Sequence, residues 1–168
     1  LEALKAGKFD RRHARTIAGF LTGCTSLLDL DCGFGFVALR ARQVVPDLTV
    51  TIHDERPALL QFSRRVALAN FPELTGIQLT MLTLNPDAMW SGLAKLTTIL
   101  RPDVLRLSDP RLPAEAFPPT VLAGLRRVLV PFLDPSEVPG IRLRLSAVFA
   151  AAGLAEDPAG EAAGTLLF

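Results

Sequence analysis

The stretch Ser26–Phe36, with the sequence S-L-L-D-L-D-C-G-F-G-F, decides the fold of this chain. It opens with a short apolar run that contains one acid, and Gly33 and Gly35 follow at alternate positions. An apolar run followed by glycines is typical of a buried strand that turns sharply into a helix. Glycine tolerates positive φ and lets a ligand approach the backbone closely. We therefore predict a strand over residues 26–30 and a candidate ligand-binding turn directly after it.

Strand and helix signals alternate along the rest of the sequence. Further strands are predicted over residues 48–52, 77–81, 103–107 and 127–133. Helices are predicted over residues 36–45, from Pro57 through Leu68, from Asn85-Pro86 through Leu93, and over residues 119–125 and 142–152. Repeated strand–helix–strand units give a parallel sheet with helices on both faces. The predicted fold class is therefore α/β, with a doubly wound, mostly parallel sheet.

The predicted domain organisation is one domain over residues 1–168, in which a helical segment (1–25) precedes an α/β core (26–168). Asp10 is the expected cap of the first helix. A helix-start signature at residues 134–137 is expected to be interrupted by Pro139-Gly140. The tail, residues 164–168, is expected to add one or two final strands.

Composition excludes several classes of protein. Lys and Arg total 18 against 17 Asp and Glu, so the formal net charge of +1 predicts neither a nucleic-acid partner nor an anionic membrane surface. The longest nearly apolar stretch, residues 145–155, falls short of the roughly 20 residues that a bilayer span needs. Two cysteines, Cys24 and Cys32, form neither a disulfide framework nor a zinc spacing, and two histidines argue against a multi-histidine metal centre. We expect no metal and a reducing, cytoplasmic setting.

An acid follows the second predicted strand at the distance expected for a nucleoside site. Asp54, with Glu55 beside it, lies about 20 residues beyond the glycine turn. A carboxylate at that place can accept hydrogen bonds from the two hydroxyls of a ribose. Capping of the next helices is an equally open role for Asp31 and Asp54. The glycine turn and the acid that follows the second strand together predict a nucleoside-bearing ligand.

The sequence DLDCGFGF resembles the first motif of class I S-adenosylmethionine-dependent methyltransferases, an acid followed by glycines at alternate positions. The longer stretch DLDCGFGFVAL is similar to that of the FkbM-type branch, and HDERPALLQFSRRVALAN resembles its E-P-x-P segment with the following helix. LTTILRPDVLRLSDP resembles the stretch that leads into K-I-D-V-E-G in that family, and RRVLVPFLDPSEVPG resembles its fifth strand. The similarity spans Leu27–Leu154.

This resemblance implies a Rossmann-like methyltransferase fold with S-adenosylmethionine as the cofactor. The cofactor would be bound by the first turn, through Asp29, Asp31, Gly33 and Gly35, and its ribose by Asp54. The implied reaction is methyl transfer to an oxygen of a small molecule or glycan.

Some positions depart from the family pattern. Asp31 replaces a glycine, so its carboxylate is expected to crowd and repel the carboxylate of S-adenosylmethionine and weaken cofactor binding. Ser108 and Pro110 stand where the family has Asp and Glu, while Arg106 keeps the charge of the family's Lys. Asp109, one position away, is the best-placed candidate for the catalytic base.

Two alternatives remain. A degenerate methyltransferase-fold protein could have lost catalysis and serve as a binding or assembly subunit, with a protein partner or a second copy as its ligand. A nucleotide-binding oxidoreductase fits less well, because D-x-D-x-G-x-G differs from the dinucleotide pattern G-x-G-x-x-G. Fold similarity alone does not decide between catalysis and binding.

Overall fold

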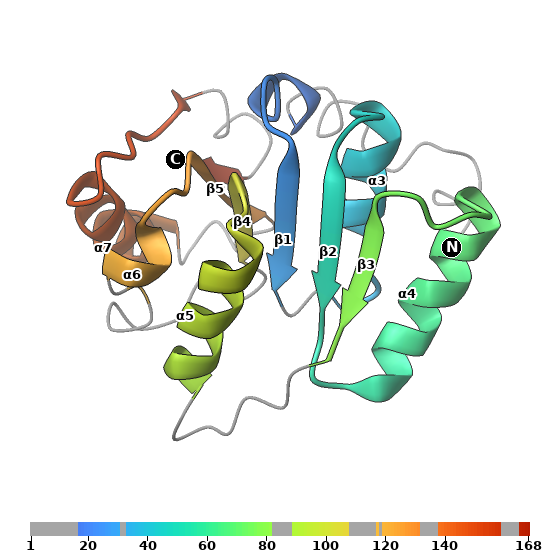
Figure 1. Cartoon of the computed structure of the whole chain (residues 1–168). Helices are drawn as coiled ribbons and strands as arrows, with labels where there is room; N and C mark the ends of the chain where they lie inside the picture. The colour runs from blue at the N-terminus through green and yellow to red at the C-terminus, as the bar shows by residue number, and fades with distance from the viewer. Residues whose placement is uncertain are drawn as a thin grey trace.

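Six strands form a single sheet in the computed structural model of the protein, which describes residues 17–30, 33–81, 89–107, 117, 119–131, 138–158 and 165–168. The strand order is β3-β2-β1-β4-β5-β6, and all neighbours are parallel except the antiparallel pair β5 and β6. The strands, visible in Figure 1, are β1 (Ser26–Leu30), β2 (Thr49–His53), β3 (Ile77–Thr80), β4 (Val104–Leu107), β5 (Arg127–Pro131) and β6 (Thr165–Leu167). The predicted doubly wound, mostly parallel sheet is confirmed.

Helices connect the parallel strands and pack on both faces of the sheet. They are α3 (Phe36–Val44), α4 (Pro57–Asn70), α5 (Met89–Leu100), α6 (Pro119–Leu122) and α7 (Val138–Ala150). Two separate apolar clusters show which helix covers which face. One contains buried residues of α3, α4 and residues 17–21, and the other contains residues of α5, α6 and α7. None of the described helices has an apolar stretch long enough to cross a membrane.

The strand sequences supply both clusters because successive side chains of a strand point to opposite faces. In β1, Leu27 belongs to the α3–α4 cluster and Leu28 to the α5–α7 cluster. In β4, Val104 and Leu105 divide in the same way. Burial on both faces explains why these strands are mostly apolar, apart from Ser26 and Asp29 in β1 and Arg106 in β4.

Asp103 braces the amino ends of three strands. Its carboxylate oxygen Oδ2 accepts hydrogen bonds from the Thr25 amide (2.6 Å) and the Thr25 hydroxyl (2.8 Å) just before β1. Its carbonyl oxygen accepts from the amides of Arg126 and Arg127 at the start of β5. Burial alone would raise the pKa of Asp103, but hydrogen bonds from Thr25 and the Ser26 backbone lower it below its ordinary value.

Several predicted boundaries differ from the structure. Pro139 and Gly140 do not interrupt a helix but lie in the first turn of α7, where a missing N–H costs no intrahelical hydrogen bond. Strand β3 ends at Thr80, so Met81 is not part of a half-buried strand, and it is 55% exposed. Helix α6 ends at Leu122, before Gly124 with its φ of +86° turns the chain towards β5. Asp10 and residues 134–137 lie outside the described residues.

We predict that Asp103→Asn lowers the free energy of unfolding by about 1 kcal/mol at pH 7, because a neutral amide accepts the Thr25 hydrogen bonds more weakly. A carboxyl whose pKa is lowered by folding stabilises the fold above its unfolded value of about 3.9 and loses that effect below it. The difference between variant and wild type should therefore shrink at pH 3. Urea unfolding at both pH values measures it, with the exposed Glu73→Gln as control; an equal difference at both values would contradict the prediction.

Candidate functional site

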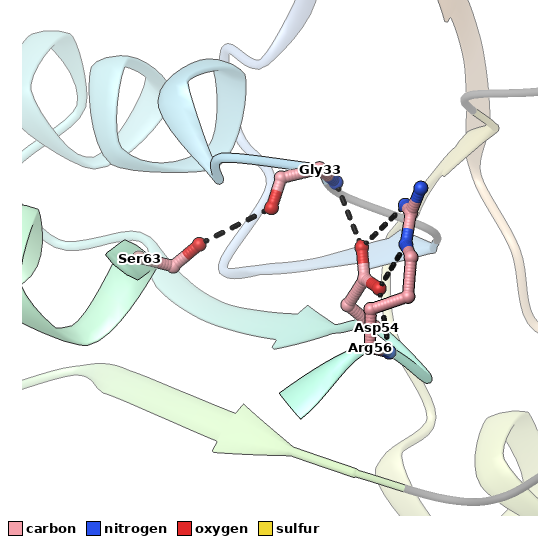
Figure 2. A network of polar contacts seen from close by, with 4 residues as sticks. All are labelled: Gly33, Asp54, Arg56 and Ser63. Atoms are coloured by element: carbon pink, nitrogen blue, oxygen red, sulfur yellow. Dashed lines mark hydrogen bonds and ion pairs between the residues drawn. The ribbon is translucent and has the colours of Figure 1, made fainter. Parts of the chain in front are cut away.

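The candidate site lies where the strand order reverses. From β1 the chain moves to β2 and β3 on one side, and then returns to β4 on the other side of β1. In doubly wound sheets, ligands bind at the carboxyl ends of the strands beside this reversal. The glycine turn follows β1 and Asp54 follows β2, so two predicted elements of the site meet at this edge (Figure 2).

Gly33 and Gly35 are both required in the turn, for different reasons. Both have positive φ, +59° at Gly33 and +69° at Gly35, which strains other residues. A Cβ on Gly35 would lie 3.0 Å from the Ser63 Oγ of α4 and 3.3 Å from the Cδ1 of Ile52. A Cβ on Gly33 would have no heavy atom within 4 Å. Gly35 therefore packs the turn against α4, whereas no atom of the described residues would crowd a Cβ on Gly33.

The amide of Gly33 donates a hydrogen bond of 2.9 Å to Oδ2 of Asp54. This bond joins the turn after β1 to the end of β2, and the Asp54 side chain is fully buried. On the other side of the turn, the buried Ser63 hydroxyl donates a long hydrogen bond of 3.5 Å to the Gly33 carbonyl (Figure 2). The sequence-predicted pairing of turn and acid is therefore a direct contact.

Arg56, which sequence reasoning missed, also binds Asp54. Its Nε donates to Oδ1 and its Nη2 donates to Oδ2, each at 2.8 Å, and its backbone amide donates to Oδ1 at 2.9 Å. Burial alone would raise the pKa of Asp54, but the hydrogen bonds from Arg56 and Gly33 lower it below its ordinary value. Asp54 is therefore an ionised carboxylate at neutral pH. The sequence signal for this contact was the position of Arg56, two residues after Asp54.

Asp29 lies inside the sheet, where it pairs with Arg106. The two residues are register partners on β1 and β4, and Arg106 Nη1 lies 2.5 Å from Asp29 Oδ1. Both side chains are buried, Asp29 completely and Arg106 to all but 8%. Alternation along the strands places both on the face covered by α3 and α4, below the glycine turn. This arrangement holds two opposite charges in the core and supports the turn from within the sheet.

Three phenylalanines form an aromatic group beside the turn, in which Phe34 and Phe62 are exposed and Phe36 is half-buried. Phe34 is 49% exposed, and its ring centroid lies 5.0 Å from that of Phe62 on α4 and 5.9 Å from that of Phe36. The Phe36 and Phe62 rings are 6.2 Å apart. These distances are within the range of favourable aromatic pairs. Phe34 sits between the two glycines, so the group borders the open side of the turn.

The remaining predicted site residues fall outside the described part of the chain. These are Asp31 within the turn and Asp109 after β4; Cys32, Ser108 and Pro110 also lie outside the described residues. Among the described residues, no group of three or more His, Cys, Asp or Glu is arranged to hold a metal ion. Cys24 is buried, and desolvation raises the pKa of its thiol although Arg127 and Arg126 lower it. It is therefore a protonated packing residue.

A cavity of about 250 Å³ lies at the opposite edge of the sheet, near the amino ends of the parallel strands. Its lining includes Arg126 and Arg127 at the start of β5, Phe20, and Phe168 after β6. The Arg127 guanidinium carbon lies 5.2 Å from the centroid of the Phe20 ring, within cation–π distance. Because it is at the other end of the strands, this cavity is not part of the candidate site.

No protein-family model matches the chain, and no curated protein matches its sequence. Solved structures do match its fold. An O-methyltransferase family protein from Burkholderia thailandensis has a TM-score of 0.64 at 18% identity, over 95% of this chain and 55% of that one. Precorrin-6y C5,15-methyltransferase from Geobacter metallireducens matches with a TM-score of 0.61 at 15% identity, over 86% of this chain and 71% of that one. The N-terminal domain of EvdMO1, solved with SAH bound, matches with a TM-score of 0.57 at 15% identity, over 83% of this chain and 68% of that one.

At these identities the structural matches show the fold alone. The fold is the Rossmann-like fold of S-adenosylmethionine-dependent methyltransferases, as the sequence resemblance implied. This chain spans little more than half of the length of the Burkholderia protein. The finer resemblance to the FkbM-type branch stays a prediction.

We predict that Arg106→Met destabilises the protein by about 3–5 kcal/mol, because it leaves the Asp29 carboxylate buried without its guanidinium partner. Replacing both residues in Asp29→Leu/Arg106→Met removes the pair together with its desolvation, so most of that stability should return. Urea unfolding of the single and double variants measures the difference. A double variant no more stable than the single one would contradict the prediction, because the loss would then not come from an unpaired buried carboxylate.

Proposed function

We propose that this chain binds S-adenosylmethionine at the carboxyl ends of β1 and β2, and transfers its methyl group to an oxygen of a small molecule or glycan. One observation carries the proposal: the hydrogen bond from the Gly33 amide to the Asp54 carboxylate, at the strand-order reversal of a fold shared with solved methyltransferases. A glycine turn tied to an ionised acid is the pair of features that a nucleoside site needs.

The chemistry of the donor set supports this cofactor. The open side of Gly33 gives room for a ligand against the backbone. The first amides of α3, a nine-residue helix, offer partial positive charge to an anionic group. Asp54 would accept hydrogen bonds from the ribose hydroxyls. Asp29, buried and paired with Arg106, would help to shape the methionine pocket beside the turn.

S-adenosylmethionine supplies an electrophilic methyl group on a positively charged sulfur. The task of the protein is then to align the acceptor in line with that methyl group and to remove the acceptor proton. Asp109 would be the base that accepts the proton of the acceptor hydroxyl. The Phe34, Phe36 and Phe62 rings would provide apolar surface beside the turn.

Further properties belong to this proposal. Residues 1–168 would act as one methyltransferase-like domain, in the cytoplasm, without a metal. The balanced net charge of +1 supports a small neutral acceptor or a protein partner over nucleic acid.

A second function is favoured by a specific observation. The Asp54 carboxylate already receives hydrogen bonds from the Arg56 side chain, and Ser108 and Pro110 replace acids of the family pattern. A non-catalytic protein of this fold, acting as a binding or assembly subunit, would need neither a free ribose acid nor those acids.

We predict that the purified chain binds S-adenosylhomocysteine, and that Asp54→Asn weakens this binding by about 10-fold or more, because hydrogen bonds to a charged acceptor are lost. Isothermal titration calorimetry measures the affinities. Glu55→Gln removes the neighbouring exposed acid and should have little effect. Urea unfolding of both variants separates a loss of binding from a loss of fold. Absence of heat from the wild type at millimolar ligand would refute the proposed cofactor.

We also predict that Asp31→Gly tightens the binding of S-adenosylmethionine by roughly 5- to 10-fold, because it removes a negative charge from beside the cofactor's carboxylate. The same titration measures the effect. Asp31→Asn serves as the matched variant, since it removes the charge and keeps the side chain. Tighter binding by both variants would indicate that charge repulsion weakens the binding of S-adenosylmethionine. Tighter binding by Asp31→Gly alone would indicate steric crowding by the side chain. If neither variant binds S-adenosylmethionine more tightly than the wild type, Asp31 does not weaken cofactor binding.

A further inference from the structure

Hydrogen bonds from Gly33 and Arg56 hold the Asp54 carboxylate. Two come from backbone amides, that of Gly33 at 2.9 Å to Oδ2 and that of Arg56 at 2.9 Å to Oδ1. The other two come from the Arg56 guanidinium, at 2.8 Å to each oxygen. Figure 2 shows this side chain curled back over the carboxylate, opposite the glycine turn.

Four donors are as many as a carboxylate accepts. An ionised carboxylate has about four lone-pair positions on its two oxygens. The two backbone amides fix the orientation of the Asp54 side chain, and the guanidinium takes two further acceptor positions. A ribose needs two acceptor positions, one for each of its two hydroxyls. Removal of the Arg56 side chain would vacate the same number of positions that a ribose requires.

We propose that the Arg56 guanidinium occupies the ribose-diol position of the site and acts as a displaceable latch that sets the affinity for nucleoside ligands. This inference rests on the proposed function. A vicinal diol and a guanidinium edge both present two parallel donors to a carboxylate, so each can replace the other. The ligand competes with a group that belongs to the protein itself.

The surroundings of Arg56 allow its side chain to leave while its backbone stays. The side chain is 56% exposed, and ion pairs that are this exposed contribute little to stability. The backbone of Arg56 is the N-cap of α4, with Pro57 as the first helical residue, so its amide keeps its bond to Asp54. Release of the latch therefore leaves the carboxylate anchored by two amides and vacates the two acceptor positions that the guanidinium held.

A ligand binds only the molecules in which this latch is open. The apparent affinity is therefore proportional to the fraction of molecules with an open latch. We expect Arg56→Ala to tighten the binding of S-adenosylhomocysteine by about 3- to 10-fold, in line with the small energies of exposed ion pairs. Arg56→Lys, which keeps the charge but loses the planar fork, should give an intermediate affinity. Arg65→Ala, a matched loss of one exposed arginine on α4, should leave the affinity unchanged.

A change in the ligand isolates the diol. The 2′,3′-dideoxy analogue of S-adenosylhomocysteine has no hydroxyls to compete with the guanidinium. Its affinity should therefore be the same for wild type and Arg56→Ala, although weaker than that of the parent ligand. A variant that tightens both ligands equally would act through charge or shape, and that result would overturn the latch.

Side-chain NMR of the wild type observes the displacement directly. Saturation with S-adenosylhomocysteine should move the Arg56 Nε–H signal to the position typical of a solvent-exposed arginine, and an unchanged signal would overturn the proposal. If the wild type binds S-adenosylhomocysteine and Arg56→Ala binds it no more tightly, the latch fails and the proposed function stands. If none of the variants binds it, the proposed function fails and the latch fails with it.

Discussion

The hydrogen bond between the Gly33 amide and the Asp54 carboxylate ties together the two elements on which the site depends. It links the turn after β1 to the end of β2, and it requires the glycine turn to keep its positive φ values. Close packing of Gly35 against Ser63 and Ile52 holds the other half of the turn. This one contact therefore fixes the position of the turn relative to the acid that follows β2.

The sheet beneath the site is held by polar contacts between neighbouring strands as well as by its two apolar clusters. Asp103 joins the amino ends of β1, β4 and β5, while Asp29 and Arg106 join β1 to β4 near their carboxyl ends. β1 is therefore fixed to β4 at both ends. Because β1 and β4 flank the strand-order reversal, this bracing also fixes the floor of the candidate site.

Much of the fold could be predicted from local patterns. Apolar runs identified every strand, and Pro57 marked the start of α4, since proline is well suited to the first helical turn. The errors have local causes. Pro139 and Gly140 have low helix propensities and therefore predict a break in the helix. In the first turn of α7, however, they destabilise the helix little. Met81 continues an apolar alternation, but the strand ends one residue earlier and leaves it exposed.

The sequence by itself determined the fold class and the two halves of the site, because strand periodicity, turn glycines and an acid after a strand are local features. It could not show which donors reach that acid. Gly33 and Asp54 are 21 residues apart, and Asp29 and Arg106 are 77 apart, so only the order of the strands brings each pair together. Arg56 is close to Asp54 in sequence, but only the folded turn, which presents both carboxylate oxygens to it, decides that the guanidinium binds both of them.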